Sequence, residues 1–133
     1  MSLSPEEELK EFLKNWIITG WQQGNTDILD EFHSSDFKDY DPSGRQDNLE
    51  GFKEGIRKLY NAFPDFSAEV EDILIDKNLT KAAVRWSGKG THKNIYLDCN
   101  PTGKTIHFKG IEILVLKDGK IKSRWGNGMV WIY

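Results

Sequence analysis

The stretch KGIEILVLKDGKIKSRWGNG, residues 109–128, holds two runs of strand-forming residues separated by Lys117-Asp118-Gly119-Lys120. Asp-Gly between two such runs is a strong signal for a tight β-hairpin. The first run is apolar except for Glu112, and the second ends in Gly126-Asn127-Gly128. The stretch therefore predicts two antiparallel strands, and it puts a carboxylate at a position where an apolar side chain is expected.

Three helices are expected before the strands. Ser4, Pro5 and Glu7 form an N-terminal capping signature, and an apolar stripe then continues to a break at residues 20–24. A short second helix is expected from residue 25 or 26 to about residue 33, followed by a loop over residues 34–47. A third helix, capped by Asp47 or Asn48, is expected to stop at Pro64.

The second half of the chain has the alternation of β-strands. Strands are expected over residues 66–75, 79–92, 104–116 and 121–133, joined by short turns and one longer loop. Helices followed by an antiparallel meander indicate a single α+β domain, residues 1–133, with three N-terminal helices against a curved antiparallel sheet. Such a cap leaves a pocket at the wide end of the sheet, which is the natural place for a function.

Composition excludes several classes of function. The chain has 133 residues, a net charge of −3 and scattered basic residues, so we expect no nucleic-acid partner. Cys99 is the only cysteine, and His33, His92 and His107 lack the spacing of a helical metal site, so no metal and no cofactor are expected. No apolar stretch approaches the ~20 residues that cross a bilayer, which favours a cytoplasmic protein without membrane contact.

Three segments together resemble the SnoaL-like polyketide cyclase family of the nuclear transport factor 2-like superfamily. They are AFPDF at 62–66, VEDILIDKNLTKAAVRWSGKGTH at 70–92, and NPTGKTIHFKGIEILVLKDGKIKSRW at 100–125. The resemblance implies a cone-shaped α+β fold with a deep pocket for a small apolar or aromatic ligand. It also implies the absence of a metal and, in many members, a homodimer.

The same resemblance identifies two departures from the family pattern. Catalytic members have an Asp directly after the Trp of the last strand, whereas Trp125 is followed here by Gly126. Members often have His-Asp-Pro in the early loop, whereas this chain has Tyr40-Asp41-Pro42. A second polar residue of the family site stands where Glu112 stands. Because Gly126 has no side chain, we expect the pocket to be wider at that point.

Glu112 has two alternative roles, which depend on the hairpin register. A two-residue turn puts Trp125 opposite Glu112, whereas a turn with a bulge puts Arg124 opposite it. The apolar pattern favours the second register, with a cross-strand ion pair to Arg124 that lowers the pKa of the carboxyl. Alternatively, Glu112 faces an apolar pocket, has a raised pKa and transfers protons.

Other candidate pocket residues have structural alternatives. Tyr40 and Asp41 precede a proline, where turn formation is favoured over a position on the pocket rim. Trp86 is expected mainly in the core, with contact to a ligand as the alternative. His92 reaches the pocket mouth or is solvated. Asn127 marks a bulge between glycines or hydrogen-bonds in the pocket.

These patterns predict a small-molecule-binding protein with isomerase or cyclase activity, in which Glu112 transfers a proton on a carbon acid and Arg124 or Tyr40 stabilises the enolate. The alternative is a non-catalytic dimeric binding or regulatory module with a vestigial pocket. Epoxide or dehydratase chemistry lacks the residue set it needs. The apolar end of the last strand, with Trp131 and Tyr133, favours a homodimer.

Overall fold

A computed structural model describes residues 2–21 and 26–132, with side chains described up to residue 126. The expected roles of the Asn127, Trp131 and Tyr133 side chains therefore lie outside the described part of the chain. The helical elements are α1 (Pro5–Asn15), the π-helix η1 that continues it (Trp16–Trp21), the 3₁₀ helix η2 (Thr26–Glu31) and α2 (Leu49–Ala62).

The two α-helices begin where the capping residues predict. The Ser4 hydroxyl accepts a hydrogen bond from the Glu7 N–H at 3.2 Å. Asn48 caps α2 by accepting from the Gly51 N–H at 3.0 Å, which decides between the two capping candidates. These bonds satisfy backbone donors that the first helical turn leaves without a partner.

The sheet contains five strands: β1 (His33–Asp39), β2 (Ser67–Ile75), β3 (Lys81–Thr91), β4 (Thr105–Lys117) and β5 (Lys120–Ile132). Their order is β1-β5-β4-β3-β2, and β2 to β5 form the expected antiparallel meander.

The prediction of a loop over residues 34–47 is wrong in its first part. Residues 33–39 form β1, which pairs parallel to β5, so the sheet is mixed rather than wholly antiparallel. The segment HSSDFKD has only one large apolar residue, and its partner strand lies far along the chain. Local propensity does not identify a strand of this kind, because pairing to a distant strand stabilises it.

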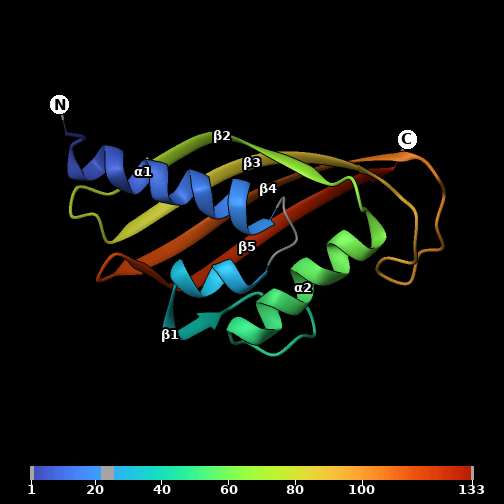
Figure 1. Cartoon of the computed structure of the whole chain (residues 1–133), viewed down its shortest axis with the longest axis horizontal. Helices are drawn as coiled ribbons and strands as arrows, with labels where there is room; N and C mark the ends of the chain where they lie inside the picture. Colours follow the sequence, from blue (N-terminus) through green and yellow to red (C-terminus); the bar gives the residue numbers. More distant parts are fainter. Residues whose placement is uncertain (1, 22–25, 133) are drawn as a thin grey trace.

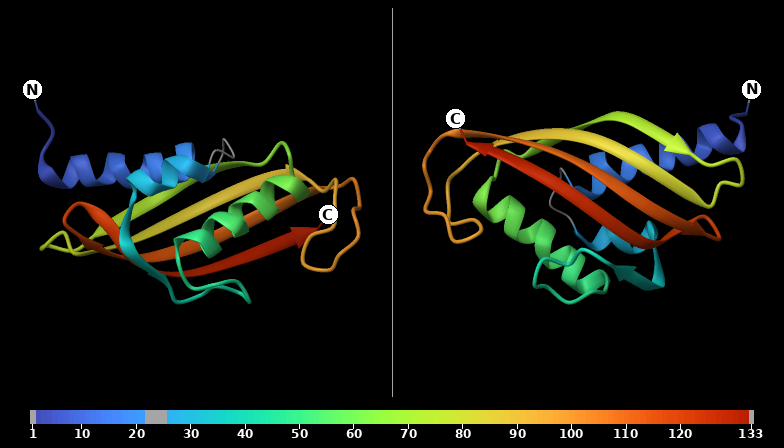
Figure 2. Two further views of the ribbon diagram at one scale, coloured as in Figure 1. Left: turned by 60° about the horizontal axis from the view of Figure 1, so that its bottom comes forward. Right: turned by 180° about the vertical axis from the view of Figure 1, so that it is seen from behind.

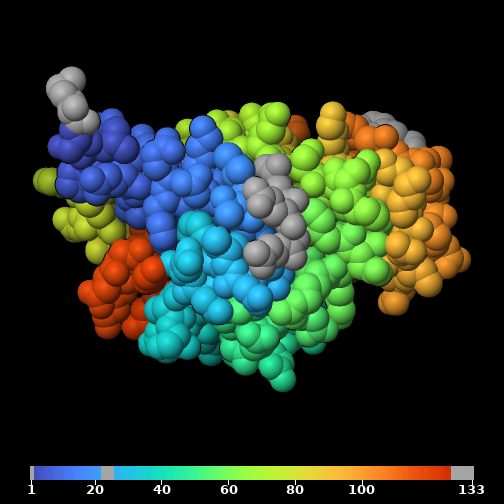
Figure 3. All heavy atoms as spheres, in the orientation of Figure 1, coloured from blue at the N-terminus to red at the C-terminus, as the bar shows by residue number. Residues whose placement is uncertain are grey.

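All helices lie on one face of the curved sheet, as Figures 1 and 2 show. In Figure 3, α1, η2 and α2 cover this face side by side, and the loop between β3 and β4 lies at the end beside α2. The interior between the layers is strongly aromatic, and its largest fully buried side chains include Trp16 and Phe63. The right-hand view of Figure 2 shows the opposite face of the sheet without a helix.

The β4–β5 hairpin has a register that neither expected alternative describes. Lys117 pairs with Lys120 across a two-residue turn whose Asp118 and Gly119 have φ of 52° and 75°. A bulge then adds one residue to β5, so Glu112 lies opposite Gly126. The face assignment is nevertheless as expected, because Glu112 and Arg124 lie on the same, inner face and are diagonal neighbours.

Candidate functional site

A cavity of about 240 Å³ lies on the inner face of the sheet, between α2, η1 and the β3–β4 loop. Its wall is mainly aromatic and aliphatic, with a group of charged side chains at one side. The residues that line it include Trp21, Asp41, Arg45, Phe52, Trp86, Tyr96, Leu97, Phe108, Glu112, Arg124 and Gly126.

Glu112 is held by Arg124 through both carboxylate oxygens. Arg124 Nε donates to Oε2 at 2.8 Å, and Arg124 Nη2 donates to Oε1 at 3.0 Å. The Glu112 side chain is 2% exposed and the Arg124 side chain 12% exposed. The expected ion pair is therefore present, with the two-bond geometry that gives arginine its strongest contacts to carboxylates.

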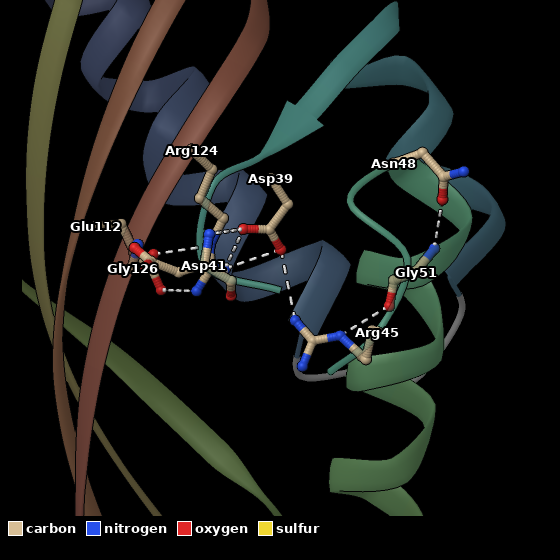
Figure 4. Close-up of polar contacts among 8 residues, drawn as sticks. All are labelled: Asp39, Asp41, Arg45, Asn48, Gly51, Glu112, Arg124 and Gly126. Atoms are coloured by element: carbon tan, nitrogen blue, oxygen red, sulfur yellow. Dashed lines mark hydrogen bonds and ion pairs between the residues drawn. The ribbon is translucent and has the colours of Figure 1, made fainter. Parts of the chain in front are cut away.

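Arg124 also binds a second buried carboxylate, that of Asp39. Its Nη1 donates to both oxygens of Asp39, at 3.0 and 3.1 Å, as Figure 4 shows. Asp39 is fully buried at the end of β1, directly beside Arg124 in the parallel register. Arg45 approaches Asp39 at 3.4 Å and donates from Nε to the Gly51 carbonyl, which ties the charged group to α2. The result is a buried chain of alternating charges.

Burial raises the pKa of the Glu112 carboxyl above its ordinary value, even though Arg124 acts to lower it. Electrostatic repulsion from Asp39 adds to the increase. The expectation that the ion pair lowers the pKa of Glu112 is therefore wrong, since full desolvation outweighs a cation divided between two carboxylates. Burial acts to lower the pKa of Arg124, but Glu112 and Asp39 raise it overall, so Arg124 stays charged.

The space that Gly126 leaves by having no side chain is filled by the Glu112–Arg124 ion pair, so it does not widen the cavity. A Cβ atom at position 126 would overlap with Nη2 of Arg124 and Oε2 of Glu112. The expectation of extra free space at this point is thus wrong, because the two longer side chains occupy it. The family aspartate at this position is incompatible with the present conformation of the pair.

Asp41 brings another carboxylate to the same point from the loop after β1. Its Oδ2 accepts a hydrogen bond from the Gly126 backbone N–H at 2.8 Å. Its own N–H donates to Asp39 Oδ1 at 2.9 Å, which fixes the loop over the charged group. Asp41 is exposed and lines the cavity, so this carboxylate lies at the cavity entrance.

The aromatic wall fixes the charged group from the other side. The Phe52 ring lies under the Arg124 guanidinium, with 5.1 Å from Cζ to the ring centroid. Trp86 packs edge-to-face on Trp21 at 5.1 Å. The Trp86 indole N–H has no ordinary hydrogen bond within the described residues, although it lies close enough to Glu112 to favour the charged carboxylate. Trp86 therefore belongs to the core and to the cavity wall at once.

Two predicted pocket residues lie elsewhere. Tyr40 points to the helix-free face, where it stacks on Trp125 with 4.4 Å between ring centroids and 2° between planes. His92 is buried, neither solvated nor part of the cavity lining, and stacks on Phe63 at 5.3 Å. Asn127 pairs through its backbone with Ile111.

Sequence reasoning missed Asp39 and Arg45. Both lie in the segment that was expected to be a loop, so no strand alternation marked Asp39 as an inward-facing residue. Phe37 and Asp39 are buried, and Lys38 between them is exposed. This alternation is the signal in the sequence that identifies Asp39 as an inward-facing residue of a strand.

Within residues 2–21 and 26–132, no group of three or more His, Cys, Asp or Glu side chains is placed to hold a metal ion. None of the described helices is both long and apolar enough to span a membrane.

Helices on one face of a curved, mixed sheet, with a partly open cavity and a buried ion pair between the layers, define the class of α+β fold. The sequence profile of the SnoaL-like polyketide cyclase family matches residues 11–127. The chain therefore belongs to this family, and the resemblance seen in its motifs is confirmed.

Solved structures of similar proteins have the same fold. TsrD from Streptomyces laurentii is 19% identical, with a TM-score of 0.78 over 96% of this chain and 91% of that one. A candidate polyketide cyclase from Bacillus cereus is 29% identical, with a TM-score of 0.77 over 95% and 78%. A SnoaL-like polyketide cyclase from Agrobacterium tumefaciens is 21% identical, with a TM-score of 0.74 over 91% of both chains. No protein of curated function matches the chain.

Proposed function

We propose that the protein binds a small apolar or aromatic molecule in this cavity and transfers a proton on a carbon acid within it, as an isomerase or cyclase. The observation that carries the proposal is the position of Glu112, a fully buried carboxyl with a raised pKa on the wall of an aromatic cavity. A raised pKa brings a carboxyl toward neutrality, where acid and base forms are both available for catalysis.

The proposed chemistry uses Glu112 and Arg124 together. A base removes a proton from the carbon next to a carbonyl, and the electron pair moves to the carbonyl oxygen to form an enolate. Arg124 supplies a fixed positive charge for that oxygen on the cavity wall, with a side chain that is 12% exposed. The proton then returns to the same or another carbon, or the enolate carbon adds to a second carbonyl in a ring closure. Glu112 exchanges its proton with the substrate, since each carboxylate oxygen keeps a lone pair beyond its bond to Arg124.

Cavity size favours a ligand of one or two rings. Ligand pockets usually have about 300–1,000 Å³, and this cavity has about 240 Å³. The aromatic wall suits a flat, ring-bearing molecule, because offset and edge-to-face contacts stabilise such a ligand beyond its buried area.

The helix-free face supports a homodimer as part of the proposal. Trp125, Ile111 and Ile113 are 40–48% exposed there, beside the stacked Tyr40. A contiguous group of large apolar side chains on a sheet face is a usual contact surface between protein chains. A second copy covering this face would leave the cavity free, because the cavity opens on the other side of the sheet.

The test uses 2-tetralone, a two-ring carbon acid. Melting curves report binding, and at ten times the dissociation constant the ligand should add about 1.4 kcal/mol of stability. Proton NMR in D₂O reports loss of the hydrogens next to the carbonyl. Glu112→Gln should bind 2-tetralone but exchange its hydrogens about 10²–10⁴-fold more slowly. Glu69→Gln, an exposed glutamate on β2, is the matched control.

Exchange at the buffer rate with retained binding would contradict catalysis and favour the non-catalytic binding module. Absence of both binding and exchange would contradict the proposed ligand class.

A further inference from the structure

We infer that Asp41 is a second catalytic carboxylate of this cavity, the base that takes the proton from carbon, while Glu112 returns a proton to the enolate. The inference rests on the proposed function and divides its proton transfer between two residues. It starts from Gly126, where two carboxylates from different parts of the chain converge.

The Glu112 carboxylate lies beside the Cα of Gly126, and the Asp41 carboxylate lies beside its backbone nitrogen. The position that a Cβ atom would occupy overlaps with Oε2 of Glu112, whereas the N–H donates to Oδ2 of Asp41 at 2.8 Å. A chain without a carboxylate on residue 126 therefore still has two carboxylates at that place. Asp41 reaches it from the loop after β1 and Glu112 from the middle of β4.

The Asp41 carboxylate is positioned but not saturated. Its Oδ2 is held by Gly126, and no described group hydrogen-bonds to its Oδ1. Tyr40 N–H donates to the Arg124 carbonyl at 2.8 Å, and Asp41 N–H donates to Asp39, so the backbone on this side is fixed to β5. A base needs an available lone pair in a fixed place, and Asp41 Oδ1 meets that requirement better than either oxygen of Glu112, both of which Arg124 binds.

The surroundings of the two carboxyls differ in the way that separates acid from base. Glu112 is fully buried and shares its cation with Asp39, conditions that favour its protonated form. Asp41 is exposed at the cavity entrance and accepts a backbone N–H through one oxygen, which leaves the other oxygen open to a substrate. Two carboxyls in contrasting environments around one cavity are the usual arrangement of an acid and a base.

The proton balance closes without any further reactant. Asp41 takes the proton from the carbon next to the carbonyl, and the electron pair of the C–H bond moves through the carbon framework to the oxygen. Glu112 gives its proton to another carbon of the enolate, which reforms the carbonyl. Asp41 then carries the first proton and Glu112 lacks one. Exchange with water restores both groups.

The experiment separates proton removal from proton return. With 5-nitrobenzisoxazole, a base removes the ring C–H proton, the N–O bond breaks and a coloured phenolate leaves, so no proton return is needed. Asp41→Asn keeps an oxygen that can accept the Gly126 N–H but cannot take a proton. We expect it to slow this elimination by about 10²-fold or more, whereas Glu112→Gln slows it less than about tenfold. Both variants should slow 2-tetralone exchange.

Two further variants keep the test independent of folding. Asp47→Asn changes an exposed carboxylate of the same loop that pairs with the exposed Lys38, and it should behave as wild type. Asp41→Ala should regain activity when acetate is added, because the small carboxylate enters the space left by the side chain. A purely structural role of Asp41 would give no such rescue.

The outcomes distinguish this inference from the proposed function. If Glu112→Gln abolishes the elimination or exchange and Asp41→Asn leaves both unchanged, the second carboxylate is refuted and Glu112 acts alone. If the wild-type protein accelerates neither reaction beyond its rate in buffer, the proposed proton transfer is refuted, and so is the role of Asp41.

Discussion

Replacing Arg124 by Met should be among the most destabilising single changes in this chain. The variant removes the cation that binds Glu112 and, of the described cations at Asp39, the nearer one, and neither carboxylate is more than 2% exposed. Breaking a buried pair in this way costs about 3–5 kcal/mol, because a charge stays buried without compensation. Arg45 remains 3.4 Å from Asp39, which favours the lower half of that range.

The loss is measurable by urea unfolding and by calorimetry at pH 7. A cost of 3–5 kcal/mol corresponds to a fall in melting temperature of about 10–20 °C for a domain of this size. The control is Arg57→Met, which removes an exposed arginine from α2 and should change stability by less than about 0.5 kcal/mol.

The double variant Arg124→Met, Glu112→Gln should recover part of the loss, since it removes one of the two buried carboxyl groups that have lost Arg124. The penalty of Arg124→Met should also shrink as pH falls, because the buried Glu112 carboxyl, whose pKa is already raised, becomes protonated. A penalty below about 1 kcal/mol at pH 7, or one that grows in acid, would refute the claim that Arg124 balances two buried carboxylates.

Three further changes test other parts of the account. Gly126→Ala should cost about 2 kcal/mol or more in urea unfolding and move the Glu112–Arg124 pair, because its Cβ has no space; unchanged stability would contradict the packing. Trp125→Asp should shift light scattering from dimer toward monomer, while Leu3→Asp, an exposed site on the N-terminal segment, should not; a monomeric wild type would refute the dimer. Leu97→Gly should widen the cavity mouth, so 2-tetralone dissociates faster. Because glycine suits the left-handed backbone of this position, with φ of 49°, the stability should fall by less than about 1 kcal/mol. Leu79→Gly is its control, since Leu79 has φ of 59° in the β2–β3 turn, and equal dissociation rates in both variants would contradict a position of Leu97 at the cavity mouth.

The fold was largely predictable because its signals are local. Capping residues marked α1 and α2, Asp118-Gly119 marked the hairpin, and alternation marked the meander. The side of the sheet on which Glu112 and Arg124 meet also followed from alternation, since every second residue shares a face.

The remaining features depend on contacts between distant segments. The bulge in β5 moved Gly126 opposite Glu112, and no turn rule encodes a bulge inside a strand. Strand β1 exists because it pairs with β5, so Asp39 could not be identified as the second partner of Arg124. Without Asp39, the ion pair alone predicted a lowered pKa for Glu112. Asp41 had the sequence of a turn, and only its hydrogen bond to Gly126 links it to the site.

The protonation of Glu112 decides whether this carboxyl can transfer protons in the cavity. Because the folded pKa is raised above the unfolded one, Glu112 adds stability that is fully present below the unfolded pKa and lost as pH rises through the folded pKa. The measurement is a ¹³C NMR titration of the Glu112 side-chain carboxyl, with Glu112→Gln used to assign the signal. We expect a midpoint above the ordinary value of about 4.5, and a stability difference between wild type and Glu112→Gln that moves in favour of the variant as pH rises. A midpoint at or below that value, with Glu112→Gln less stable than wild type by the same amount from pH 6 to 9, would mean that Arg124 fixes Glu112 as a structural anion and that this carboxyl does not transfer protons.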